Sequence, residues 1–239
     1  APTTPSDGTT AESSEVPTPG RWIAWSVIPI AIAITLQRFG QIVYLTRVDR
    51  ILNPVESATR AFDLWNPFAD MGAVQWQQNG YWIPFDAWFA FARLLHIPTW
   101  ASERIFIFGL IAIAFWGFVR LADALRIGRP ATRIVAAFAY ALSPVILARI
   151  GWQSPFAMGT IFLPWVLIPL VHGSRQGSPR TAAARSSLPL ALMGGVNAAV
   201  TIAVLPIPLL FLLTRTRGPR RASLLRWWGL FVPLSILWW

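Results

Sequence analysis

Residues 105–133, "IFIFGLIAIAFWGFVRLADALRIGRPATR", decide the fold because they join an apolar run to a basic loop. The run has no charged side chain before Arg120, whereas 120–133 contain four Arg and one Asp. A helix crosses a bilayer with about 17 to 25 apolar residues, so runs of this kind predict membrane spans. The runs in this chain are somewhat short, and we therefore expect membrane thinning, tilt or burial inside the protein to help them cross. The expected spans of this all-α, polytopic transmembrane protein are 22–36, 105–119, 134–148, 158–171 and 188–213, with a last run from Trp227.

The composition supports a membrane protein and excludes several other classes. Of 239 residues, 55% are hydrophobic and only 13% charged, less charge than a soluble domain carries. The net charge of +10 comes from arginines in short loops between apolar runs, so we expect no nucleic-acid partner. Without Cys there is no disulfide and no thiolate zinc site, and the two His form no metal spacing. No cofactor is indicated, and a divalent metal stays open.

The distribution of charge predicts the orientation. Three basic loops (120–133, 175–185 and 215–226) carry twelve Arg and one acid, whereas residues 38–104 carry six Arg and six acids. The positive-inside rule therefore predicts cytoplasmic basic loops and a long outer loop at about 46–100. The Pro/Ser/Thr-rich residues 1–20 are expected to be a disordered cytoplasmic tail. The Arg-rich face would suit an acidic cytoplasmic partner.

The stretch 188–213 conflicts with this orientation if it crosses once, because the basic loop at 215–226 would then lie outside. Gly-Gly and Asn interrupt the stretch at 194–197. We therefore favour two short legs that turn there over a single crossing, since broken helices are stable where protein covers their backbone.

The outer loop collects polar and aromatic side chains. A short amphipathic helix is expected from Asn53 to Leu64, with Glu56 and Arg60 one turn apart. A second, at 84–95, either lies in the membrane interface or packs against the spans. Amides bond sugar hydroxyls and aromatic rings cover apolar sugar faces, although the same residues also serve as interfacial anchors. These residues are Trp65, Asn66, Gln75, Trp76, Gln77, Gln78, Asn79, Tyr81 and Trp82.

Asp49 lies between Arg47 and Arg50, directly after the first apolar run. It is either part of an interfacial ion-pair cluster or a general base that deprotonates an attacking hydroxyl. Arg47 or Arg50 would hold it ionised, or face a lipid phosphate.

Arg149 and Gln153, in the next outer connection, either snorkel to the interface or clamp the phosphate of a lipid-linked donor. No Walker pattern and no Asp-x-Asp pair occurs, which argues against an ATP-driven pump and a soluble nucleotide-sugar enzyme.

Four blocks of sequence together resemble one family, the membrane α-(1→3)-arabinofuranosyltransferases of mycobacteria and related actinobacteria in the GT-C superfamily. The resemblance extends from about residue 22 to the end of the chain. The blocks are "VDRILNPVESATRAFDLWNPFADMGAVQWQQNGYWIP" (48–84), "RLADALRIGRPATRIVAAFAYALSPVIL" (120–147), "LPWVLIP" (163–169) and "ALMGGVNAA" (191–199).

The resemblance implies that residues 21–239 are the N-terminal part of a longer GT-C transmembrane domain. It implies transfer of arabinofuranose, with inversion, from decaprenyl-phosphoryl-arabinose to arabinan or lipoarabinomannan at the outer face of the plasma membrane. Asp49 matches the family's catalytic base, and Asn53, Trp65, Asn66 and Tyr81 would shape the pocket among membrane lipids. A transporter or flippase with helices broken at Gly194 and Pro206, or a non-catalytic assembly subunit, is the alternative.

Overall fold

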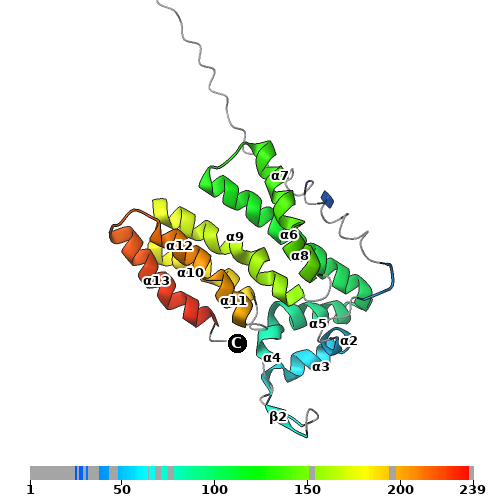
Figure 1. Ribbon diagram of the computed structural model, residues 1–239. Helices are drawn as coiled ribbons and strands as arrows, with labels where there is room; N and C mark the ends of the chain where they lie inside the picture. Colours follow the sequence, from blue (N-terminus) through cyan, green and yellow to red (C-terminus); the bar gives the residue numbers. More distant parts are fainter. Residues whose placement is uncertain are drawn as a thin grey trace, which may run out of the picture.

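The structure is a computed structural model that describes residues 25, 27–28, 31, 38–42, 48–63, 65–67, 71–74, 78–150, 154–193 and 198–236. Most of the first expected span, 22–36, and the tail 1–20 therefore lie outside the described residues. Helices that run back and forth between two ends make up the larger part of the chain (Figure 1). They are α6 (Thr99–Leu125), α7 (Pro130–Ala141), α8 (Pro144–Ile150), α9 (Ser154–Arg175), α10 (Pro179–Leu192), α11 (Ala198–Val204), α12 (Pro206–Leu213) and α13 (Pro219–Ile236).

Proline sets where many of these helices begin. Its fixed φ suits the first helical position, where the missing N–H has no partner to lose. Five bundle helices start at a proline, namely α7, α8, α10, α12 and α13. Each is therefore separated from the helix before it by a short connection or a bend.

The expectation that the spans are short was wrong for two of them. Helix α6 has 27 residues and α9 has 22, so at 1.5 Å per residue α6 is about 40 Å long. Both extend into polar residues that the hydropathy pattern had assigned to loops. By length and composition α6 and residues 156–175 of α9 are able to cross a membrane.

The expected span 134–148 is not one straight helix. Helices α7 and α8 meet at a bend of 42°, and together they make a third candidate crossing. The bend follows Ser143, which precedes Pro144, and a residue before proline is sterically disfavoured in the helical region. The Ser143 N–H still donates to the Tyr140 carbonyl at 3.2 Å, and the Tyr140 hydroxyl donates to the carbonyl of Thr160 in α9.

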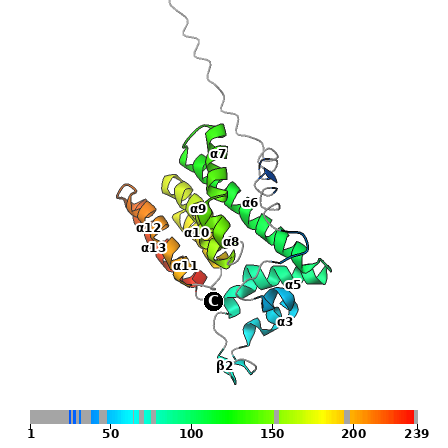
Figure 2. The ribbon, with the colours of Figure 1, turned by 45° about the vertical axis from the view of Figure 1, so that its right-hand side comes forward.

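The region 188–213 turns back on itself, as the charge argument favoured. Helix α10 runs away from the end where it begins, and α11 and α12 return to that end (Figures 1 and 2). The turn at 194–197 lies outside the described residues. One expectation here was wrong, since most of the basic segment 175–185 is helical: α10 already starts at Pro179, with Ser178 as its N-cap.

Small residues let α6, α9, α10 and α13 pack closely. A Cβ on Gly117 of α6 would lie 2.5 Å from the indole nitrogen of Trp165 in α9. That nitrogen donates to the Ile113 carbonyl at 2.9 Å. Buried Ser186 of α10 donates to the Val166 carbonyl of α9 at 2.7 Å, and accepts from the Trp228 indole of α13 at 3.2 Å. Polar contacts between helices thus accompany the apolar packing.

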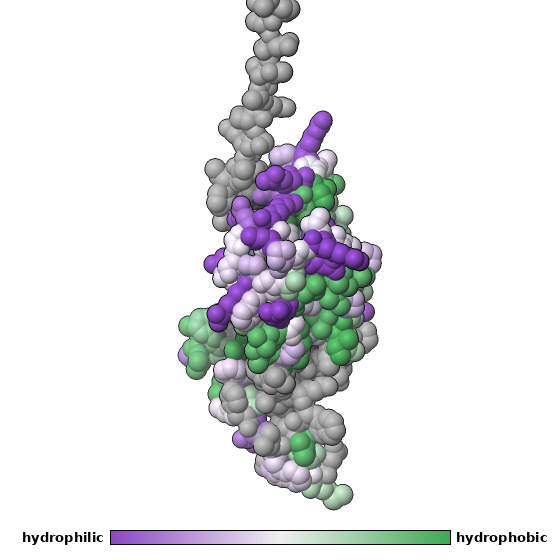
Figure 3. All heavy atoms as spheres, turned by 90° about the vertical axis from the view of Figure 1, so that its left-hand side faces the viewer, coloured by the Kyte–Doolittle hydropathy of each residue, from purple (hydrophilic) through white to green (hydrophobic). Residues whose placement is uncertain are grey.

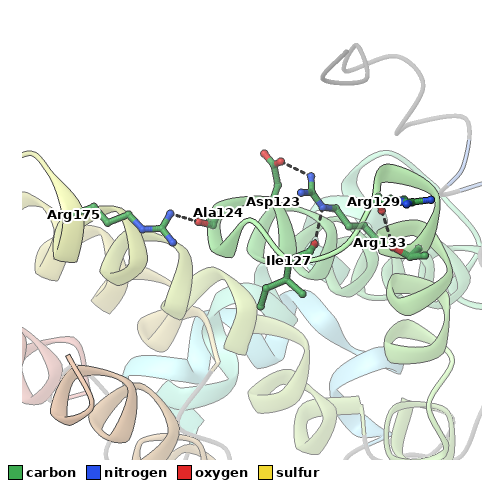
Figure 4. A network of polar contacts seen from close by, with 7 residues as sticks. Asp123, Ala124, Ile127, Arg129, Arg133 and Arg175 are labelled. Carbon is green, nitrogen blue, oxygen red and sulfur yellow. Dashed lines mark hydrogen bonds and ion pairs between the residues drawn. The ribbon is translucent and has the colours of Figure 1, made fainter. Parts of the chain in front are cut away.

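The three basic loops meet at one end of the bundle, which we call the basic end and define by residues 125–130, 175–179 and 213–219. Figure 3 shows hydrophilic side chains gathered toward this end and hydrophobic ones below them. Close contacts lie within the first of these loops and join it to the end of α9 (Figure 4). Arg133 binds Asp123 at 2.7 Å and donates to the Ile127 carbonyl at 2.8 Å, while Arg175 of α9 donates to the Ala124 carbonyl at the end of α6 at 2.5 Å.

The opposite end, the loop end, carries the described part of residues 48–98 (Figure 1). The expected helix at 53–64 is confirmed as α3 followed by a 3₁₀ turn, η1, and Glu56 binds Arg60 at 3.0 Å. A two-residue antiparallel ladder follows, which the sequence pattern had not predicted. The elements are α2 (Asp49–Leu52), α3 (Pro54–Thr59), η1 (Arg60–Phe62), β1 (Trp65–Asn66), β2 (Ala73–Val74), α4 (Gln78–Tyr81), η2 (Trp82–Asp86) and α5 (Ala87–Leu94).

Helix α5 corresponds to the second short helix expected in the loop, and it packs against the start of α6. Phe89 is buried, and its ring centroid lies 5.6 Å from that of Phe106 in α6. On its other side Phe91 and Leu94 are exposed. One face of α5 therefore belongs to the protein core, while the other presents apolar side chains at the surface of the structure.

Candidate active site

Helix α2 holds the candidate base at the beginning of the loop region. Asp49 is its first residue, and the next two residues, Arg50 and Ile51, are 0% and 1% exposed. The side chain of Asp49 lies outside the described part of the chain. The two residues that follow it anchor α2 in the protein interior.

A buried ion pair fixes α2 to the segment that leads into α5. Nη1 of Arg50 donates to Oδ2 of Asp86 at 2.5 Å, and both side chains are fully buried. The Arg50 guanidinium also lies 4.3 Å from the centre of the Tyr81 ring. Tyr81 in turn contacts Phe85 edge to face, with centroids 5.8 Å apart. An ion pair and a cation–π contact thus converge on the residue next to Asp49, and an aromatic contact supports Tyr81.

This pairing corrects one expectation about the arginines. Arg50 was expected either to hold Asp49 ionised or to face a lipid phosphate. A guanidinium that is 0% exposed and bonded to Asp86 does not face a lipid phosphate. Arg47 lies outside the described residues, so its role stays a prediction.

Trp65 presents an aromatic surface on the small hairpin. Its side chain is 55% exposed, on β1. The other side of the ring rests on Gly72, where a Cβ would lie 2.4 Å from the Trp65 ring and where φ is +103°. Only glycine fits both the backbone conformation and the space at this position, so Gly72 supports one face of the Trp65 ring.

The other expected site residues occupy several elements. Asn53 is exposed at the start of α3, and Tyr81 is half-buried beneath Arg50. Asn66 lies in β1 opposite Ala73, and Gln78 begins α4, but their side chains lie outside the described part. Arg149 is exposed in the last turn of α8. Gln75 and Gln153 are not among the described residues. Among these residues, Tyr81 contacts the Asp49 segment through the Arg50 guanidinium.

Sequence reasoning missed several buried charged residues beside this site. Asp86 lies at the end of η2, and Glu103 and Arg104 lie in the second turn of α6, at 2% and 7% exposed. Nη2 of Arg104 donates to the carbonyls of Arg38 at 2.7 Å and Gln41 at 3.3 Å, which ties the incoming chain to α6. A signal was present, since Asp86 and Arg104 directly border apolar or aromatic runs and Glu103 is next to Arg104. Within the described residues no group of three His, Cys, Asp or Glu side chains is arranged to hold a metal ion.

Long apolar helices, a bent pair and a loop region folded onto the start of α6 define the class, a polytopic α-helical membrane domain. The family model described as "Alpha-(1->3)-arabinofuranosyltransferase, N-terminal GT-C domain" matches residues 29–239. The chain therefore belongs to this family, and the resemblance noted in the sequence is confirmed.

Similar proteins agree with that assignment. The α-(1→3)-arabinofuranosyltransferase of Mycobacterium tuberculosis is 37% identical over 217 residues, 88% of this chain and 15% of the relative. The enzyme of the same name from Mycolicibacterium smegmatis is 35% identical over 84% of this chain and 14% of its own length. The cryo-EM structure of arabinofuranosyltransferase AftD from mycobacteria matches with a TM-score of 0.87 at 34% identity, over 95% of this chain and 17% of that one. The chain thus spans about 15% of the length of the curated relatives that it matches.

Proposed function

We propose that this chain forms the N-terminal part of an inverting membrane arabinofuranosyltransferase. The enzyme moves arabinofuranose from a polyprenyl-phosphate donor, decaprenyl-phosphoryl-arabinose, to cell-envelope arabinan on the outer side of the membrane. Its family membership supports arabinosyl transfer. The observation that carries the residue assignment is the buried Arg50–Asp86 pair, which fixes the backbone of α2 at the position of Asp49.

In the proposed reaction the Asp49 carboxylate accepts the proton of an acceptor hydroxyl. As that O–H bond breaks, the oxygen attacks the anomeric carbon of arabinofuranose, and the bond to the donor phosphate oxygen breaks on the opposite face. The configuration inverts because the displacement is a single step. A general base of this kind contributes roughly 10²- to 10⁴-fold to the rate when it is held within reach of the hydroxyl.

The leaving polyprenyl phosphate needs positive charge near the departing oxygen. Arg149 is the candidate, since it is exposed in the last turn of α8, and guanidinium matches phosphate oxygens bidentately. A divalent metal would supply the same stabilisation. The described residues contain no cluster of three acids, histidines or cysteines that could hold such an ion, so at least part of its ligands would come from elsewhere.

The remaining residues would bind the sugars. The exposed Trp65 ring is suited to cover the apolar face of a furanose, because the hairpin supports it from the other side. Asn53, Asn66, Gln75, Gln78 and Gln153 supply amide donors and acceptors. Tyr81 would act indirectly as a positioning residue, because its ring lies against Arg50 and so helps to hold α2 in place.

The charge distribution supports an outward-facing site. The basic end carries the arginines that the positive-inside rule assigns to the cytoplasm, and the Asp49 segment belongs to the opposite end (Figure 1). A lipid-linked donor with its phosphate at the outer interface would then lie at the level of α2.

The substitution Asp49→Asn tests the assignment. We expect it to lower arabinose transfer from the lipid-linked donor roughly 10²-fold or more while the protein keeps its fold, because the amide does not accept the proton. Asp63→Asn is the matched control, an exposed acid of the same loop for which we expect full activity. Undiminished transfer by a folded Asp49→Asn enzyme would show that Asp49 is not the base.

A further inference from the structure

A cavity of about 390 Å³ opens at the basic end, where α12 turns into α13 beside the last turn of α9. This volume falls in the range of about 300 to 1,000 Å³ that small-molecule sites occupy. Two buried leucines, Leu212 and Leu224, contribute apolar surface. Half of the other lining residues are basic, namely Arg175, Arg215, Arg217, Arg220 and Arg221.

No acid balances these five guanidiniums. None of the residues that line the cavity is Asp or Glu. The shortage extends over half the chain, since residues 124–239 contain twelve Arg and neither Asp nor Glu. Asp123, the last acid in the sequence, is bound to Arg133 at 2.7 Å (Figure 4). The positive charge of the cavity therefore has to be met by something other than this half of the chain.

The contacts that the arginines do make leave their charge in place. Nη1 of Arg220 donates to the carbonyls of Gly173 at 3.0 Å and Gly177 at 2.9 Å, and Arg175 donates to the Ala124 carbonyl. Arg215 lies 4.5 Å from the centre of the Phe211 ring. Carbonyls and rings orient a guanidinium without neutralising it, so these contacts hold the cations around the cavity.

Arg221 adds a donor that lacks an acceptor. Its Nε is buried and has no hydrogen-bond partner among the described residues. A buried polar group without a partner is costly, and an oxygen ligand in the cavity would remove that cost. Helix α13 begins at Pro219 in the same wall, so the positive end of its dipole lies beside the cavity.

We infer that this cavity binds a phosphate group. Several guanidiniums without carboxylates match the charge and the planar bidentate geometry of phosphate oxygens. The source is either the head group of an anionic membrane lipid or a soluble phosphorylated compound. A lipid source is supported by Arg180 at the start of α10, which lies 4.9 Å from the Trp227 ring, next to the apolar part of α13. This site is separate from the glycosyl-transfer site proposed at the loop end.

The test uses the purified protein in detergent and measures ligand retention by native mass spectrometry and competition binding. The probes are phosphatidylglycerol, phosphatidylcholine and inorganic phosphate. The variant Arg217→Gln/Arg221→Gln removes two cations from the cavity wall. The matched control, Arg126→Gln/Arg129→Gln, removes two cations from the loop between α6 and α7 at the same end of the bundle but outside the cavity.

We expect the unmodified protein to retain phosphatidylglycerol in preference to phosphatidylcholine. The cavity variant should bind at least about tenfold more weakly, and the control should bind as the unmodified protein does. Competition by inorganic phosphate at low concentration, with no preference among lipids, would support the same site with a soluble ligand. Equal weakening in both variants, or no preference for any of the anionic probes, would overturn the inference.

Discussion

The two ends of the molecule handle charge in opposite ways. Around the loop end, residues 38–104 contain six Arg and six acids, and Arg50 and Asp86 are paired in complete burial. At the basic end, arginines outnumber acids twelve to one in the three loops, and Arg175 and Arg220 bond to backbone carbonyls. Balanced charge is used inside the fold to hold a segment in place, whereas unbalanced charge stays available to the membrane and to anions.

The largest expected effect concerns which side of the membrane each end faces. Because the chain has no Cys, single cysteines report their own accessibility. Thr59→Cys in α3 and Thr216→Cys between α12 and α13 replace exposed threonines at the two ends. We expect a membrane-impermeant thiol reagent added to intact cells to label the first and not the second. The reverse pattern would place the basic end outside and remove the basis of the proposed site.

The next effect is on stability at the loop end. Asp86→Asn leaves Arg50 buried without its carboxylate, which we expect to cost about 3 to 5 kcal/mol. The measurement is the thermal unfolding midpoint in detergent, together with transfer activity, since α2 would lose its anchor. Glu56→Gln breaks an exposed ion pair, in which the side chain of Arg60 is 39% exposed and that of Glu56 is 53% exposed. This change should cost less than about 1 kcal/mol. Similar losses in the two variants would contradict the distinction between buried and exposed pairs.

A smaller effect is expected at the basic end. Arg220→Gln removes the bonds to the Gly173 and Gly177 carbonyls, which close the end of α9. Because Arg220 is exposed and water replaces these bonds, we expect a loss of about 1 kcal/mol and no change in arabinose transfer. Unfolding followed as for Asp86→Asn checks the first point, and a transfer assay checks the second. A loss as large as that of Asp86→Asn would mean that the basic end is also held by its charges.

Local patterns predicted much of the fold. The short helix at 53–64 with its Glu56–Arg60 pair was foreseen, because side chains four residues apart share a helix face. The reversal within 188–213 was also expected from the sequence, because the basic loop at 215–226 was predicted to lie on the same side as the other two basic loops. The lengths of α6 and α9 were underestimated because hydropathy marks the apolar part of a helix and not its polar turns.

The sequence by itself determined the helical membrane class and the charge asymmetry of the chain. These depend on composition and on neighbours within one helical turn. Only the tertiary structure decided that Arg50 pairs with Asp86, 36 residues away, and that the end of α9 and the basic segment around the start of α13 line one cavity. These contacts depend on how the helices pack. A buried charge is costly unless it is paired, and packing decides which distant residue is close enough to pair with it.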